Sequence, residues 1–281
     1  GLWAARTAGA FGNSLQISTC PSATAYEEVN KTTVADAAMA VGDTVVTVTS
    51  AAGITAGDIV NFGDEYEYRV VSVATNDLNI VRKDEPAYFG TSESSGLHQA
   101  PTNGAQVRRR WKYYDLFDKA PGTSPYAQAK SGVNDELHIV VIDEDGDITG
   151  TKGDVLEKFE AVSKASDAKT AQGSVNYYPD VIYKASNYIY WMDHNAGGSN
   201  WGSAANGTTF TDVTSVSNVS LQAGSDGTAA TIGQRKTAYE KFQDGETVDV
   251  GLIIAGAGDA THIGNLITIA ENRKDAVVFA S

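Results

Sequence analysis

The segment Asp143–Asp147, DEDGD, carries four carboxylates in five residues and could in principle gather oxygen ligands for calcium. An EF-hand loop has oxygen ligands at positions one, three and five, glycine at six and glutamate at twelve. Here Gly146 falls at position four and Asp154 at position twelve. Turn acids that face solvent also have no reason to shift their pKa values apart, as acid–base catalysis requires. We therefore predict a hairpin turn in which Gly146 takes a positive φ.

Two glycine-containing turns could cradle a phosphate or present a nucleophile. Gly256-Ala-Gly258 lies between a predicted strand and a predicted helix, but Thr261 stands where the dinucleotide fingerprint has its third glycine. The chain also has no Gly-Lys-Ser/Thr triplet. Gly224-Ser-Asp-Gly227 lacks the Gly-x-Ser-x-Gly pattern, so Ser225 is a poor nucleophile candidate. The Gly256–Asp259 turn leaves open an alternative in which the chain is an α/β nucleotide-binding protein or enzyme.

The histidines and the cysteine do not form a reactive pattern. His98, His138, His194 and His262 are far apart in sequence, and none has a metal-ligand partner three or four residues away. His138 stands at the head of a core strand and is interpreted as a hydrogen-bonded core histidine, and His262 as a residue of a helix's first turn. Cys20 has no nearby basic residue to favour the thiolate, so we predict a buried, inert thiol. We predict no catalytic residue, metal or cofactor.

The balance of charge argues against two classes of partner. The chain has 281 residues, with 35 Asp and Glu against 21 Lys and Arg, a net charge of −14. Such a surface repels polyanions, so we expect no nucleic-acid partner. The run Val107–Tyr114 interleaves cations and aromatics as a nucleic-acid binder could, but we favour a strand whose Arg stems cover aromatic faces or oppose acidic neighbours. No apolar stretch approaches the roughly 20 residues of a membrane span, so we expect no membrane partner.

The elements that would position these residues follow from hydrophobic periodicity. The apolar run 137–142 predicts a central strand that is buried on both faces. Alternation over 15–19 predicts a half-exposed strand, and 188–192 reads as a further strand after a helical turn opened by Pro179. In the last third we predict a helix over 230–243, a strand over 248–255, a second helix over 260–271 capped by Asp259, and a parallel strand over 276–280.

Residues 33–83 have a different texture, with short β signals at 45–49, 58–62, 66–73 and 78–81 separated by turn residues. They predict a small antiparallel barrel or sandwich inserted into the main domain, and a bulge where the apolar phase changes at Val70 and Val71. Residues 84–106 read as a return linker. The predicted fold is thus an α/β domain, a mixed sheet flanked by helices, over 1–32 and 84–281, with a small all-β domain over 33–83. A spacer is the favoured role for this insertion, and a surface or glycan-binding module is the alternative.

An ordered series of motifs carries a family resemblance. The series comprises Arg108–Asp118, Ala120–Tyr126, Asp135–Gly150, Glu157–Lys169, Asn176–Tyr178, Ser220–Gly227 and Asn272–Phe279. Together with most of residues 1–20, it resembles the contractile tail sheath proteins of T-even-type bacteriophages. The resemblance implies a strand over 155–162, where helical spacing is an equally good reading, and a structural loop at 224–227.

The resemblance implies a structural protomer without enzymatic activity. It would polymerise helically around the tail tube as stacked hexameric rings, and contract to drive the tube through the host envelope for genome ejection. The implied partners are further copies of the chain, the tail tube protein, and the baseplate and tail terminator proteins. Its implied location is the virion tail sheath of a myovirus, assembled in the host cytoplasm. Because the chain starts at Gly1 and stops after an apolar run, we expect an internal fragment that is itself monomeric.

Overall fold

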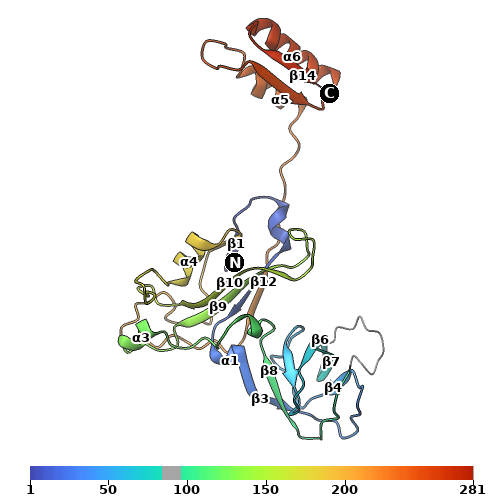
Figure 1. Ribbon diagram of the computed structural model, residues 1–281, viewed down its shortest axis with the longest axis vertical. Helices are drawn as coiled ribbons and strands as arrows, with labels where there is room; N and C mark the ends of the chain where they lie inside the picture. The colour runs from blue at the N-terminus through green and yellow to red at the C-terminus, as the bar shows by residue number, and fades with distance from the viewer. Residues whose placement is uncertain (84–95, 281) are drawn as a thin grey trace. The chain divides into compact units, whose positions relative to one another are not determined.

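The computed structural model describes residues 1–83 and 96–280, which form two compact units, Gly1–Ser225 and Asp226–Ser281 (Figure 1). Helices and strands both contribute, consistent with the predicted α/β class. The prediction of a mixed sheet is wrong, because antiparallel and parallel pairs occur in separate sheets: the only parallel ladder in the described residues joins β13 and β14. The part of the predicted linker before residue 96 lies outside the described residues. The domain boundaries at 32/33 and 83/84 stay a prediction.

The first unit is organised around β9 (Glu136–Asp143), which lies inside a four-stranded antiparallel sheet of order β10-β9-β2-β12. Every residue of β9 is buried. Alternate side chains enter two different cores: Leu137, Ile139 and Val141 join one cluster, and Val140 and Ile142 join another. The prediction of a central strand packed on both faces is confirmed.

The other strands of this sheet are β10 (Asp154–Ser163), β2 (Leu15–Cys20) and β12 (Ser217–Ser220). The strand reading of 155–162 is therefore confirmed. The prediction that 15–19 is half-exposed is wrong, because β2 lies between β9 and β12 and all its residues except Gln16 are buried. Ser18 and Thr19 are buried polar residues, and the Ser18 hydroxyl accepts a hydrogen bond from the Trp111 indole at 3.0 Å.

The turn after β9 is built on one buried carboxylate. Asp143 accepts hydrogen bonds from the Ser14 hydroxyl (2.6 Å), the Thr149 amide (2.7 Å) and the Ile148 amide (3.0 Å). Burial alone would raise the pKa of Asp143, but the hydrogen bonds from Ser14 and then Thr149 outweigh it and lower the pKa to about 2. Gly146 has φ +84°, as predicted for the hairpin. Only Asp143 departs from the expectation of solvent-facing turn acids, since it is fully buried.

A six-stranded antiparallel sheet holds the strands of residues 33–83 together with β3 and β8, in the order β3-β8-β5-β6-β7-β4. Its strands are β3 (Glu27–Thr33), β4 (Val45–Thr47), β5 (Ile59–Asn61), β6 (Tyr68–Ala74), β7 (Asp77–Arg82) and β8 (Gln106–Arg110). The predicted bulge is present as a register shift between Val70 and Ser72. The named strands do not close into a barrel, although an isolated bridge joins Val34 to Val48 at the ends of the two outer strands.

Short elements complete the first unit. They are β1 (Trp3–Ala5) paired with β11 (Ile189–Trp191), η1 (Ala10–Ser14), α1 (Ala23–Tyr26), η3 (Tyr114–Leu116), α3 (Pro125–Ala129) and α4 (Tyr178–Ala185). Pro179 lies in the first turn of α4, where its missing N–H leaves no helical bond unmade, and Ile182 of this helix packs into the same cluster as Leu137.

The second unit contains α5 (Ile232–Glu240), β13 (Leu252–Gly256), α6 (Ala260–Arg273) and β14 (Val277–Ala280). The β13–α6–β14 segment is the predicted parallel strand-helix-strand unit, and Asp259 caps α6 through the His262 amide at 2.8 Å. The first strand begins at Leu252 instead of the predicted Val248. The reason is that the Val248 and Val250 carbonyls accept hydrogen bonds from the buried Arg273 guanidinium, at 2.9 and 3.2 Å. Arg273 thus holds the approach to β13 in addition to standing near the helix C-terminus.

Candidate functional site

The three arginines of β8 lie on two different faces of the strand. Arg109 points into the protein, where only 3% of its side chain is exposed and its Nε lies 3.1 Å from Asp58 Oδ2. Arg108 and Arg110 point to the opposite face, because successive strand residues alternate. Both line a cavity of about 570 Å³ beside the turn that joins β5 to β6. The prediction that this basic run opposes acidic neighbours is confirmed by these contacts.

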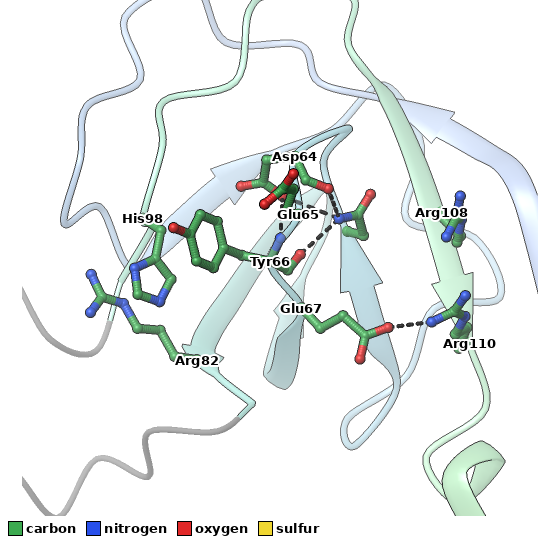
Figure 2. Close-up of a pocket in the computed structure, with 9 residues that line it drawn as sticks. Asp64, Glu65, Tyr66, Glu67, Arg82, His98, Arg108 and Arg110 are labelled. Carbon is green, nitrogen blue, oxygen red and sulfur yellow. Dashed lines mark hydrogen bonds and ion pairs between the residues drawn. The ribbon is translucent and has the colours of Figure 1, made fainter.

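One wall of the cavity is a charged network around Glu67. Its carboxylate accepts hydrogen bonds from Lys83 Nζ (3.1 Å) and from the Tyr114 hydroxyl (2.5 Å). It also accepts from the Arg110 guanidinium, as Figure 2 shows. Burial raises the pKa of Glu67, but the hydrogen bonds from Tyr114 and Lys83 reverse this and hold it below its usual value. Arg110 is further held by Glu27 at 3.0 Å. This wall is therefore ionised and fixed at neutral pH.

The opposite wall is an aromatic platform. The Tyr66 ring stacks on the His98 ring with centroids 4.0 Å apart and an interplanar angle of 21° (Figure 2). Tyr66 remains 43% exposed, since His98 covers only one side of its ring. Figure 2 shows Arg108 and Arg110 together on β8, across the cavity from the Tyr66 and His98 rings.

The turn that carries Tyr66 is rigidly hydrogen bonded. The Asn61 amide donates to the Asp64 carbonyl and the Tyr66 carbonyl, both at 2.7 Å. Asp64 Oδ2 accepts from the Tyr68 hydroxyl at 3.0 Å, and that hydroxyl accepts from the His98 amide at 3.0 Å. Because Tyr68 is fully buried, this chain of bonds ties both rings of the platform to the core. The cavity is thus preorganised and offers cationic, anionic and aromatic surfaces to a ligand.

Comparison with known proteins adds an independent observation. No family model matches the chain. It is similar to the tail sheath protein of Salmonella phage ViI, with 24% identity over an alignment of 291 positions that covers 99% of the chain. The chain spans 42% of the length of that curated relative.

This similarity supports a relationship to the phage tail sheath proteins. The similarity extends over nearly the whole sequence, so both compact units fall within the aligned region. The cavity also lies in this region, and its residues come from the six-stranded sheet and the neighbouring turns. Of the residues that line it, only Arg108 and Arg110 belong to the motifs that carry the resemblance.

The structure places Cys20 and His138, which we predicted to be unreactive, in the core. Cys20 is fully buried, and burial raises the pKa of its thiol to about 12. His138 is also fully buried; its Nε2 lies 2.8 Å from the Lys119 carbonyl oxygen, and its Nδ1 accepts from the Ala161 amide at 2.9 Å. Burial lowers the pKa of His138 and favours the neutral ring. Both interpretations, a buried thiol and a hydrogen-bonded core histidine, are confirmed.

The remaining histidines do not converge. His98 belongs to the platform, His194 hydrogen bonds to the Tyr178 hydroxyl at 2.6 Å, and His262 lies in the first turn of α6, as predicted. In the described ranges 1–83 and 96–280, no group of three or more His, Cys, Asp or Glu could hold a metal ion. Nor does any helix in those ranges have the length and apolarity to cross a bilayer.

The Gly256–Asp259 turn is occupied by its own side chains. Gly256 has φ +63°, and the Asp259 carboxylate takes the His262 amide at the start of α6. The His262 ring lies against Gly258, where a Cβ would stand 2.7 Å from it. A carboxylate at the helix N-terminus repels the phosphate that a free N-terminus would attract, so this geometry disfavours nucleotide binding. The loop at 224–227 is tied to η1, because Gly224 and the Asn13 side chain exchange hydrogen bonds of 2.7 and 2.9 Å.

Sequence reasoning missed a buried charged network beneath β9. Asp135 accepts from the Ser124 amide and hydroxyl, both at 2.7 Å, and from the Ser163 hydroxyl at 2.5 Å. Lys164 is fully buried and donates to the Pro21 and Asn134 carbonyls at 2.7 Å. Burial lowers the pKa of Lys164 to about 8. The available signal was a lysine directly after a strand with apolar alternation, a pattern that also fits an exposed strand end.

Proposed function

We propose that this chain is the body of a contractile tail sheath protomer. In the complete protein, copies would polymerise helically as stacked hexameric rings around the tail tube. The baseplate would trigger a change to a shorter, wider arrangement that drives the tube through the host envelope. The observation that carries the proposal is the similarity to a tail sheath protein across 99% of the chain.

The packing of the first unit suits a rigid lever. β9 is buried on both faces, and its terminal turn is fixed by the Asp143 hydrogen bonds. Buried polar groups at Asp135 and Lys164 are satisfied by neighbouring hydroxyls and carbonyls. A body of this kind transmits displacement because close-packed interiors deform little. The stroke would then be a rearrangement of contacts between subunits, without chemistry inside each one.

The second unit presents a surface suited to further protein contact. In β13 and β14, Ile253 and Val278 pack toward α6, and the alternate residues are exposed. The exposed set is Leu252 at 53%, Ile254 at 72%, Val277 at 58% and Phe279 at 59%. Parallel sheets are normally covered on both faces, and a two-stranded sheet alone is marginally stable. This face therefore favours a role within a larger assembly.

Electron microscopy of the full-length protein, expressed without other phage proteins, tests the proposal. Tubes of regular diameter are the expected product. The variant Ile254→Asp should reduce tube formation, whereas the matched control Thr268→Asp, on the exposed side of α6, should not. Full-length protein that stays dispersed across a range of salt and concentration would contradict the proposal.

The proposed partners follow from this role. They are further copies of the chain, the tail tube protein, and the baseplate and tail terminator proteins, with assembly in the host cytoplasm and a final place in the virion tail. Residues 1–281 alone should sediment as a monomer. A stable ring formed by this chain alone would refute that part of the proposal.

A further inference from the structure

We propose that the cavity formed by Tyr66, His98, Arg108 and Glu65 binds a pyranose ring of a polysaccharide. This proposal does not depend on the sheath role proposed above. The inference starts from the geometry of the aromatic platform. The face of a pyranose ring carries C–H groups, which pack on an aromatic face, and its rim carries hydroxyls that donate and accept hydrogen bonds.

The platform meets the first requirement. Tyr66 is held from one side by His98 at 4.0 Å and keeps 43% of its surface exposed. Its backbone is fixed by Asn61 and its stacking partner by the buried Tyr68 hydroxyl. Tyr66 therefore does not have to be ordered when a ligand arrives, which removes part of the entropic cost of binding.

The polar groups of the cavity meet the second requirement. Glu67 and Arg110 are engaged with each other and with Lys83 and Glu27. Arg108 is held more loosely, by one ion pair with Glu27 at 3.5 Å, and its side chain is 39% exposed. Glu65 is exposed at the rim. Arg108 can donate to a sugar hydroxyl and Glu65 can accept from one, so a polyhydroxyl ligand satisfies both groups.

The size and charge of the site agree with this ligand class. About 570 Å³ lies within the roughly 300–1,000 Å³ typical of small-molecule sites. Three lining arginines, Arg82, Arg108 and Arg110, are balanced by the carboxylates of Asp64, Glu65 and Glu67. A neutral sugar therefore fits better than a strongly charged anion, whose charge the carboxylates would oppose.

Saturation-transfer NMR on the 281-residue chain tests the site. The probes are the methyl glycosides of glucose, galactose, N-acetylglucosamine and glucuronic acid. We expect a neutral probe to bind saturably, with a Kd on the order of 1 mM. Tyr66→Ala and Arg108→Ala should each weaken binding at least tenfold, and Tyr66→Phe should retain it. Arg69→Ala, an exposed arginine outside the cavity, and Tyr183→Ala, an aromatic that is 67% exposed on α4, are the matched controls and should bind as the parent does.

Three results would overturn the inference. The first is no saturable signal from any probe in the folded parent chain. The second is binding that survives Tyr66→Ala, which would place the sugar elsewhere. The third is loss of tube assembly by full-length Arg108→Ala with no sugar signal from the parent, which would make the cavity a contact between copies of the chain. Failure of tube assembly in the unsubstituted protein would instead count against the sheath proposal and leave the sugar measurement unaffected.

Discussion

The buried ion pair between Asp58 and Arg109 gives the sharpest test of how the first unit is held together. Their side chains are 4% and 3% exposed, and Asp58 Oδ2 lies 3.1 Å from Arg109 Nε. Asp58 also accepts from the Thr55 amide at 2.8 Å, and Arg109 donates to the Ala25 carbonyl at 3.0 Å. The pair therefore joins α1, β8 and the turn before β5.

Removing one partner should cost much more than removing both. Burial raises the pKa of Asp58, and the attraction of Arg109 does not cancel that effect, so desolvation offsets most of the gain from pairing. In Asp58→Ala the Arg109 charge stays buried and keeps only the more distant Glu28 carboxylate, at 3.6 Å, so we expect a loss of about 3 kcal/mol or more. We expect a similar loss in Arg109→Met. The double variant Asp58→Leu/Arg109→Met should lose only about 2 kcal/mol, because it leaves no unpaired charge in the core. The Thr55 amide and hydroxyl and the Ala25 carbonyl each lose a hydrogen bond, and the partly exposed Glu28 loses an ion pair of 3.6 Å.

Urea unfolding followed by tryptophan fluorescence measures these differences, because all four tryptophans lie in the first unit. A loss of 3 kcal/mol corresponds to a fall in Tm of roughly 6–12 °C for a unit of this size. A double variant that loses as much as the two single variants combined would refute the reasoning. So would a single variant that costs less than about 1 kcal/mol.

Three other predictions rest on separate features. Asp143 has a pKa lowered to about 2, so its stabilisation is complete above about pH 5 and is lost as the pH falls through about 2; Asp143→Asn should flatten acid unfolding curves in that window, and parallel curves for the two proteins would contradict this. Gly146→Ala should cost more stability than Gly150→Ala, because both have positive φ but only at Gly146 would a Cβ meet backbone, 2.9 Å from Lys152 N; equal urea midpoints would exclude a steric contribution. Cys20, with its pKa raised to about 12, should react with a thiol reagent at pH 8 only at the rate of unfolding, and fast labelling of native protein would show that the thiol is accessible.

Local pattern predicted most of the elements around the core. The apolar run at 137–142, Gly146 in its turn, and the Asp259 cap before a helix are each specified by neighbours within a few residues. The change in the apolar alternation at Val70–Val71 likewise predicted the bulge in β6. These features depend on periodicity, φ preference and capping, which act over short distances along the chain.

Long-range contacts decided the features that the sequence misassigned or missed. The alternation of β2 is that of a half-exposed strand, yet Trp111, 93 residues after Ser18 in the chain, donates to the Ser18 hydroxyl and packs in the same cluster as Cys20, so the polar face is buried. The Asp143 carboxylate resembles its exposed neighbours in the sequence and is distinguished only by Ser14 and the returning turn.

The amino-acid sequence by itself determined which segments form strands and helices. It also carried a resemblance to tail sheath proteins, which the comparison with a phage tail sheath protein supports. The tertiary structure alone decided which polar groups are buried and which converge. Tyr66 and Arg108 are 42 positions apart and share a cavity only because β5 pairs with both β6 and β8. Strand order is a property of the whole folded chain, and no local pattern encodes it.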